Sequence, residues 1–352
     1  MADGTGINRR IAVIGTGANG SCVSADLVNN GYDVTMIDQW PAHVEVMRAN
    51  GLHISLADEE LHVRVKAFHL CDVATFHEKF DIVFLAMKAY DARWPAELMK
   101  PWLKEDGVFV ALQNAMTAES VAEIIGPERT LGCAVELSSE IFNPGIVRRN
   151  TSRQKTWFGL GSLTPATRDR EAEIQAILSH VGRCDLQEDV LSAKWMKLIV
   201  NTICLAPFAI VGTKMSEAPK LPGMRELMIK LGGEALAVGQ KLGYEPEPVF
   251  GLTPEEIKGT NQLVEKIYEK LSADIGTRSL RNCSLQDLMK GRKSEVDLIN
   301  GLVAEEGRRF GLDTPANRVV VELTHEIEAG RLKPDPANMA LLMERLAAAE
   351  PA

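Results

Sequence analysis

The chain has 352 residues, of which 45% are hydrophobic and 25% charged, and a formal net charge of −9. This length allows two domains with separate cores, and the composition is that of a globular protein. Because the net charge is negative and no run of basic residues is present, we expect no nucleic-acid partner. No apolar run of ~18 residues and no secretory signal is evident, so we expect a cytoplasmic protein without a membrane partner. The six cysteines form no CxxC pair, which is typical of reduced thiols.

Short apolar runs alternate with amphipathic stretches in the first half, which is the pattern of parallel βαβ units. The expected strands are 10–15, 33–37, 81–86, 107–112, 130–135 and 183–188. The expected helices are 20–30, 41–50, 118–125 and 171–182. We also expect an antiparallel hairpin of 145–150 and 156–160 that closes the sheet.

Long helical patterns dominate the second half. The expected helices are 191–210, 224–242, 254–271, 284–310 and 315–329, before a loose tail at 347–352. We therefore predict an α/β protein with an N-terminal Rossmann domain of mostly parallel sheet (1–188) and an all-helical substrate and catalytic domain (189–352).

A Gly-Thr-Gly-Ala-Asn-Gly segment follows the first apolar strand and opens a helix, which is the context that a dinucleotide-binding GxGxxG motif requires. The glycines permit a tight turn, close approach of the pyrophosphate and close packing of helix on strand, while the helix N-terminus faces the negative charge. We expect the cofactor to contact Gly15, Gly17, Ala18, Asn19 and Gly20. A glycine-rich turn without a ligand is the alternative.

The second strand is followed by an acid at the position where Rossmann folds contact the adenosine ribose. The carboxylate of Asp38 there would accept hydrogen bonds from the ribose hydroxyls and repel a 2′-phosphate. We therefore favour NAD over NADP. NADP stays open, because Asp38 can instead cap the turn before Pro41 while Arg48 binds a phosphate.

A candidate proton donor opens the helical half. Lys197 and Asn201 are four residues apart and so share one face of a helix. A lysine can protonate a carbonyl oxygen as hydride arrives, above all when burial lowers its pKa, and Asn201 can orient the same oxygen. The alternative is an exposed lysine on an amphipathic helix. Histidine is a weaker candidate, since only His325 lies in this half.

Further motifs carry a family resemblance. They are Gln-Asp-Leu-Met-Lys-Gly-Arg-Lys-Ser-Glu-Val-Asp at 286–297 and Gly-Leu-Asp-Thr-Pro-Ala-Asn at 311–317. With the glycine turn, Lys88, the Leu-Gln-Asn of 112–114 and the Trp-x-Lys-Leu-x-x-Asn of 195–201, they span nearly the whole chain. The chain resembles the ketopantoate reductase (2-dehydropantoate 2-reductase) family.

The resemblance implies roles for single residues. Lys197 resembles the family's general acid, and Glu295 the carboxylate that binds substrate and helps to position that lysine. Asn201 resembles the family's helix-face asparagine. Lys88 and Asn114 resemble residues beside the nicotinamide, with Asn114 also near the substrate. The alternative for Glu295 is a charge at a helix N-terminus.

Three positions depart from the family pattern. Leu205 stands where the family has a second asparagine, and Ala115 replaces the glycine of its Leu-Gln-Asn-Gly turn. The family's substrate-binding serine falls on Cys283, with Ser284 one place later. Because a site built on hydrogen bonds selects for them, these departures predict a bulkier or more apolar substrate than ketopantoate. The acid Asp38 is also unusual for a family that mostly uses NADPH.

We therefore predict an NAD(P)-dependent oxidoreductase that transfers hydride to or from a small keto or hydroxy acid or related carbonyl, with Lys197 as general acid/base and no metal. Authentic ketopantoate reduction with NADPH is the alternative within this class. A non-catalytic dinucleotide sensor is the alternative outside it. We expect a homodimer. The segment 244–275, longer than in the family, is expected to cover the cleft, to form a dimer surface or to be a solvated insertion.

Overall fold

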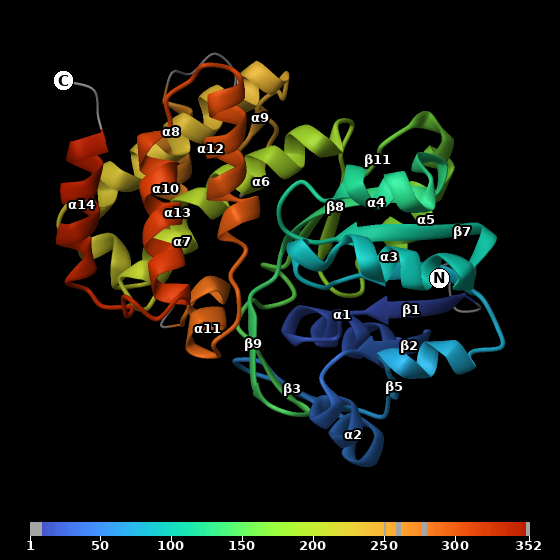
Figure 1. The fold of residues 1–352 in the computed structure, drawn as a ribbon. Coiled ribbons are helices and arrows are strands. Elements are labelled where there is room, and N and C mark those ends of the chain that lie inside the picture. Colours follow the sequence, from blue (N-terminus) through green and yellow to red (C-terminus); the bar gives the residue numbers. More distant parts are fainter. Residues whose placement is uncertain (1–8, 250, 258–261, 276–279, 350–352) are drawn as a thin grey trace. The chain divides into compact units, whose positions relative to one another are not determined.

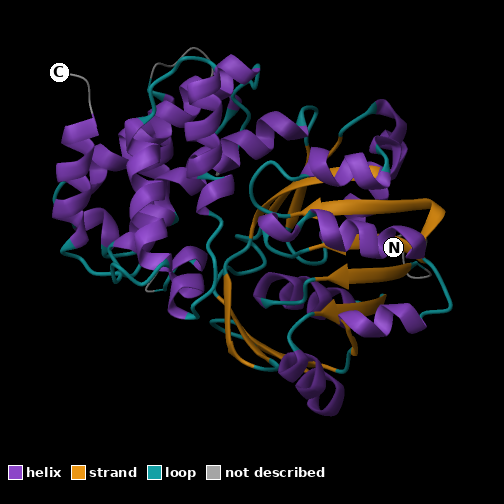
Figure 2. Cartoon of the chain, in the orientation of Figure 1, coloured by secondary structure: helices purple, strands orange, loops and turns teal. Residues whose placement is uncertain are grey.

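The computed structural model describes residues 9–249, 251–257, 262–275 and 280–349 (Figure 1). It divides into two compact units, Met1–Leu191 and Ser192–Ala352, whereas the sequence pattern places the boundary after residue 188. The first unit contains the strands, and the second is built from helices (Figure 2).

An eight-stranded sheet forms the centre of the first unit, in the order β12-β11-β8-β7-β6-β1-β2-β5. Its strands are β1 (Arg10–Ile14), β2 (Asp33–Asp38), β5 (Lys66–His69), β6 (Phe80–Leu85), β7 (Leu103–Leu112), β8 (Thr130–Glu136), β11 (Trp157–Ser162) and β12 (Arg183–Leu186). Every neighbouring pair is parallel except β8 and β11. The predicted mostly parallel sheet is therefore confirmed.

The sheet has a buried apolar cluster on each of its two faces. From β1, Ile11 and Val13 join one cluster, while Ala12 and Ile14 join the other. This follows from the alternation of side chains along a strand. The α-helices of this unit are α1 (Ala18–Asn29), α2 (Pro41–Asn50), α3 (Arg93–Met99), α4 (Ala118–Ile125) and α5 (Arg168–Leu178). Its 3-10 helices are η1 (Leu70–Thr75), η2 (Ala89–Asp91), η3 (Lys100–Trp102), η4 (Pro127–Arg129) and η5 (Pro165–Thr167).

A second sheet, in the order β4-β3-β10-β9, packs against α1. Its strands are β3 (Leu52–Ser55), β4 (Glu60–Val63), β9 (Ser139–Asn143) and β10 (Ile146–Arg149). The predicted hairpin of 145–150 with 156–160 is wrong, because β10 pairs with β9 and β3 while β11 pairs with β8 and β12. Alternating polarity identifies a strand, but the partner is decided by packing between distant segments.

A buried ion cluster ties α1 to the strand β10 and its flanking loop. The carboxylate of Asp26, which is 2% exposed, pairs with Arg149 at 2.5 Å and with Arg153 at 2.6 Å. Arg149 also donates to the carbonyl oxygens of Thr151 and Val181. A buried charge of this kind is tolerated because its partner and its hydrogen bonds are all present.

The second unit is helical. Its helices are α6 (Val190–Cys204), α7 (Ala206–Ile210), η6 (Ala218–Lys220), α8 (Met224–Leu242), α9 (Pro254–Ile257), α10 (Leu263–Ile275), α11 (Cys283–Met289), η7 (Val296–Leu298), α12 (Asn300–Arg309), α13 (Pro315–Glu328) and α14 (Asn338–Ala349). The expected single helix over 191–210 is wrong, because a new helix starts after Leu205 with Pro207 in its first turn. The expected helix over 284–310 is also wrong, since Gly291 takes a φ of +63° and ends α11.

From sequence alone, one stretch of this unit can be mistaken for a membrane span and another for a solvated insertion. An 18-residue window within Val190–Ile210 reaches the mean hydropathy (1.3) of a membrane span, but 94% of that window is buried inside the structure, as in the core of a soluble protein. The segment 244–275 is not a solvated insertion where the structure describes it. A Cβ at Gly232 of α8 would lie 2.6 Å from Val264 of α10, and Ile267 is buried as well.

Candidate active site

The GxGxxG segment forms the turn from β1 to α1. Gly15 takes a φ of +90°, and a Cβ there would lie 2.4 Å from the Met87 side chain. A Cβ at Gly20 would lie 2.2 Å from the Gly15 carbonyl oxygen, so a side chain at either glycine would prevent this turn. At Gly17 a Cβ would meet no neighbouring heavy atom within 4 Å. The turn is therefore tight on its inner side and open at Gly17.

The N-terminus of α1 fits an anion. Gly17 is its N-cap residue and provides no side-chain cap, and the first turn holds no acidic residue. Ala18 and Asn19 are the first residues of the helix, and the Asn19 side-chain oxygen accepts a hydrogen bond from the Ser139 hydroxyl at 2.5 Å. The helix N-terminus thus keeps its partial positive charge for a ligand such as a pyrophosphate.

Asp38 is the last residue of β2 and is 6% exposed. Its carboxylate accepts a hydrogen bond from the Trp40 backbone N–H at 2.8 Å and one from the Thr16 hydroxyl at 3.4 Å. Asp38 therefore does cap the turn before Pro41, as the alternative interpretation supposes. It also lies beside the glycine turn, at the ribose position of the Rossmann fold.

Arg48, the alternative phosphate ligand, has other partners. Its side chain donates to the Ala67 carbonyl oxygen at 2.8 Å and forms ion pairs with Glu45 at 3.0 Å and Asp72 at 2.5 Å. Two carboxylates therefore neutralise the guanidinium, which weakens the case for a 2′-phosphate ligand at this position.

Lys88 and Asn114 follow β6 and β7, whose carboxyl ends are neighbours in the sheet. Gln113 links the two segments, because its side-chain amide donates to the carbonyl oxygens of Met87 at 2.9 Å and Lys88 at 3.1 Å. Ala115 takes a φ of +60°, a conformation that favours glycine. The family's glycine at this turn thus has a conformational reason, and this chain keeps the turn with an alanine.

On α6, Lys197, Asn201 and Leu205 succeed one another at intervals of four residues and so follow one side of the helix axis. Lys197 is partly exposed, whereas the residues on either side of it are buried. Asn201 is buried, and Leu205, directly after the helix, is 8% exposed.

Trp195 fixes how α6 packs on α8. Its indole Nε1–H donates to the Ala235 carbonyl oxygen at 3.0 Å, and its ring stacks on Tyr244 at a centroid distance of 5.2 Å. Gly239 leaves the space for this ring, because a Cβ there would lie 2.1 Å from the indole nitrogen. This contact fixes one side of α6 against α8.

Asn282 connects two of the three positions at which the chain departs from its family, Leu205 and Cys283. Its side-chain amide donates to the carbonyl oxygens of Cys204 and Leu205, both at 2.8 Å, and its side-chain oxygen caps α11. Cys283, which is partly exposed, and Ser284, which is buried, are the first residues of that helix. The end of α6 and the start of α11 are thereby joined.

Glu295 lies between the Gly291 turn and η7 and is 4% exposed. Glu295 is the N-cap residue of η7, at a helix N-terminus as the alternative interpretation supposes, although its side chain forms no cap hydrogen bond there. The preceding residue anchors the segment, since the backbone N–H and the hydroxyl of Ser294 both donate to one oxygen of Glu328, each at 2.7 Å.

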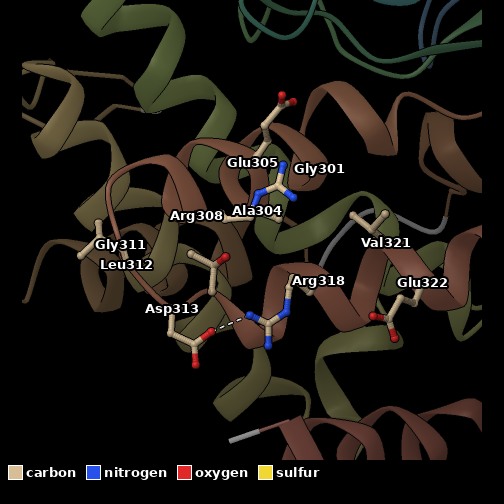
Figure 3. A pocket seen from close by; sticks show the side chains of 11 residues that line it. Gly301, Ala304, Glu305, Arg308, Gly311, Leu312, Asp313, Arg318, Val321 and Glu322 are labelled. Atoms are coloured by element: carbon tan, nitrogen blue, oxygen red, sulfur yellow. Dashed lines mark hydrogen bonds and ion pairs between the residues drawn. The ribbon is translucent and has the colours of Figure 1, made fainter.

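A separate pocket of about 740 Å³ runs along α12 and α13 (Figure 3). Its lining includes Gly301, Arg308, Arg318 and Glu322, and Arg318 forms an ion pair with Asp313 at 2.6 Å. None of the predicted site residues lines it, and its charges are of both signs. No group of metal-ligating side chains is present among the described residues.

Sequence reasoning missed two supporting residues. Asn282 precedes a helix, and an asparagine in that position is a recognisable N-cap signal. His43 contacts the glycine turn through Thr16 and the second sheet through Gly145, and no motif in the sequence links these distant positions.

Known proteins resemble this chain in sequence. Ketopantoate reductase PanE/ApbA matches residues 11–162, and the C-terminal part of the same family matches residues 189–328. The 2-dehydropantoate 2-reductase of Archaeoglobus fulgidus is 26% identical over 329 residues, which are 92% of this chain and 99% of that protein. The enzyme of the same name from Lactococcus lactis is 24% identical over 330 residues, 91% of this chain and 98% of that protein.

Solved structures agree in fold. D-mandelate dehydrogenase with NADH and anilino(oxo)acetate has a TM-score of 0.80 at 20% identity, covering 91% of this chain and 99% of that one. A PanE/ApbA family ketopantoate reductase from Ralstonia eutropha has a TM-score of 0.77 at 24% identity, covering 92% and 99%. The chain belongs to the PanE/ApbA ketopantoate reductase family, a family of NAD(P)-dependent reductases that act on keto/hydroxy acid pairs.

Proposed function

We propose that this chain is an NAD-dependent 2-hydroxyacid dehydrogenase whose substrate carries a wholly apolar aromatic or branched side chain, without the hydroxyl that ketopantoate has at C4. The observation that carries this proposal is the apolar pair Leu205 and Cys283, joined through Asn282, where the family has asparagine and serine. A pocket wall without these two polar groups favours apolar groups and loses the selectivity that hydrogen bonds provide. The ligand named for the structural relative D-mandelate dehydrogenase, anilino(oxo)acetate, has this chemistry.

Three residues of the second unit would handle the substrate. Lys197 would donate a proton to the carbonyl oxygen of the 2-keto acid and take it back in the oxidative direction. Asn201, on the same side of α6, would hold that oxygen. Glu295 would bind the substrate and help to orient Lys197.

The dinucleotide would be held by the first unit. Gly15, Gly17, Ala18, Asn19 and Gly20 provide the open turn and the uncapped helix N-terminus that a pyrophosphate requires. When bound, the nicotinamide supplies or accepts the hydride. Lys88 and Asn114, at the carboxyl ends of adjacent strands, would lie on the nicotinamide side.

NAD is proposed over NADP. The buried carboxylate of Asp38 at the end of β2 would repel a 2′-phosphate, and Arg48 is already paired with two acids. Solved complexes of D-mandelate dehydrogenase contain NADH, which is compatible with this choice.

The test is a substrate panel with both cofactors. We expect kcat/KM with NADH to be higher for phenylglyoxylate and 2-ketoisocaproate than for ketopantoate. The double variant Leu205→Asn, Cys283→Ser should shift this preference toward ketopantoate. Lys197→Ala should lower turnover by roughly 10²–10⁴-fold and leave NADH binding intact. Unchanged turnover in Lys197→Ala would remove this lysine from the mechanism, and absence of any turnover in the wild type would favour a dinucleotide sensor.

Reduction of ketopantoate is the second candidate, favoured by the names of the relatives that align over almost the whole chain. A higher kcat/KM for ketopantoate with NADPH than for any apolar keto acid with NADH would establish it.

We also propose a homodimer, which sedimentation velocity would test.

A further inference from the structure

A histidine of α2 contacts the glycine turn. His43 is fully buried; its Nε2 lies 2.9 Å from the Thr16 carbonyl oxygen, and its Nδ1 lies 2.9 Å from the Gly145 backbone nitrogen. A backbone N–H can only donate, so Nδ1 is the acceptor and the neutral ring carries its proton on Nε2. The imidazole therefore donates a hydrogen bond to Thr16.

The surroundings favour this neutral ring. Burial lowers the pKa of His43 below its ordinary value of 6.5, although the nearby carboxylate of Asp38 acts in the opposite direction. Protonation would place a second N–H on Nδ1, opposite the N–H of Gly145, and one hydrogen bond would be lost. The tautomer that donates to Thr16 is thus maintained around neutral pH.

The Thr16 carbonyl oxygen has a second donor. The hydroxyl of Ser21, in the first turn of α1, donates to it at 2.6 Å, and both Ser21 and Thr16 are fully buried. In a trans peptide the C=O and the following N–H point in opposite directions. Two donors that hold the Thr16 carbonyl inward therefore turn the Gly17 N–H outward, on a turn that is open at Gly17.

We propose that His43 is a positioning residue for the dinucleotide, which together with Ser21 fixes the Thr16–Gly17 peptide so that the Gly17 N–H is presented to the pyrophosphate. The inference rests on the proposed dinucleotide site. Without these two donors the peptide can rotate, and a carbonyl oxygen facing a pyrophosphate repels it. The role of His43 is thus exerted through a backbone N–H that it does not touch.

The test uses two amide variants that each keep one half of the imidazole. The side-chain amide introduced by His43→Gln keeps a donor that reaches as far as Nε2, whereas His43→Asn keeps an acceptor at the position of Nδ1. NADH and NADPH are titrated into the full-length protein by nicotinamide fluorescence at one salt concentration and neutral pH. We expect His43→Asn to weaken binding about tenfold, or ~1.4 kcal/mol, and Ser21→Ala roughly threefold, with His43→Gln within about twofold of the wild type.

The melting temperature of each variant is measured beside its affinity. A merely structural histidine would make affinity follow stability, whereas the proposal expects His43→Gln to retain affinity even where it loses stability. If the wild type binds neither dinucleotide, the proposed site fails together with this inference. If the wild type binds a dinucleotide and both His43→Asn and Ser21→Ala bind it as tightly as the wild type, only the role of His43 is overturned. The same conclusion follows if His43→Gln weakens binding as much as His43→Asn. Should His43→Asn fail to fold, Ser21→Ala decides between the same two outcomes.

Discussion

Helix α8 contains two glycines whose replacement by alanine should change stability in opposite directions. At Gly233 a Cβ would meet no neighbouring heavy atom within 4 Å, so Gly233→Ala gains helix propensity alone, ~1 kcal/mol. At Gly239 a Cβ would lie 2.1 Å from Nε1 and 2.4 Å from Cδ1 of Trp195. These atoms belong to a rigid, buried ring, so the indole must move.

Moving the indole has two costs. Overpacking in a core costs ~1–3 kcal/mol, and a displaced indole N–H that no longer reaches the Ala235 carbonyl costs a further ~1–3 kcal/mol. After subtraction of the same ~1 kcal/mol of helix propensity, Gly239→Ala should lower the free energy of unfolding by roughly 1–5 kcal/mol. Thermal unfolding followed by far-ultraviolet circular dichroism measures this, since 1 kcal/mol corresponds to ~2–4 °C in a unit of this size.

The two variants also differ in their expected activity. Trp195 lies two positions before Lys197 on α6, so Gly239→Ala should lower kcat as well, whereas Gly233→Ala should leave it unchanged. Melting temperatures that shift in the same direction in both variants would refute the packing argument. A destabilised Gly239→Ala with wild-type kcat would show that the indole contact does not orient Lys197.

Three further changes test other parts of the structure. Asp26→Asn leaves the buried guanidinium of Arg149 without its carboxylate and should lower the free energy of unfolding, measured by urea denaturation, by about 3–5 kcal/mol. A decrease below about 1 kcal/mol would mean that the ion cluster is not desolvated. Ser294→Ala should lower kcat/KM roughly tenfold, ~1.4 kcal/mol, at unchanged NADH affinity, whereas Ser294→Thr should keep the wild-type kcat/KM. If the two variants have the same kcat/KM, the bond from Ser294 to Glu328 does not position Glu295. Burial raises the pKa of Asp81, but the Lys104 hydrogen bond and a backbone N–H outweigh this and hold it below 3.8. Stability from this carboxylate is therefore complete above pH 3.8 and lost as the pH falls through the folded-state pKa, so Asp81→Asn should flatten the acid end of the stability curve.

Local signals explain which parts of the fold the sequence predicts. The glycine turn is recognisable because the φ of Gly15 and the close approach of Gly20 to the Gly15 carbonyl oxygen require glycine, and both are properties of the motif itself. The partner of β10 was not predictable, because alternating polarity is the same whichever strand lies alongside. Helix α14 was missed although Met339, Leu342 and Leu346 follow helical spacing and are buried, so its signal was present in the sequence.

The candidate site shows the same division between local and distant information. A motif marks the residues that carry chemistry, such as Lys197 in its Trp-x-Lys-Leu-x-x-Asn segment. It does not mark the residues that hold them in place when these lie on another element. Gly239 accommodates the ring of Trp195, and Asn282 ties the end of α6 to the start of α11.

This division bears on how the substrate preference should be changed. Leu205 and Cys283 are two of the positions at which the chain departs from the ketopantoate pattern, and their relative placement depends on the hydrogen bonds of Asn282 to the carbonyl oxygens at the end of α6. These bonds involve main-chain atoms, so they survive Leu205→Asn and Cys283→Ser. Replacing Asn282 would instead remove one hydrogen-bond donor from the carbonyl oxygens of Cys204 and Leu205 and leave α11 without its cap. Side-chain exchange at Leu205 and Cys283 should therefore alter specificity on an intact scaffold, whereas the same exchange in an Asn282→Ala background should lose activity toward every substrate.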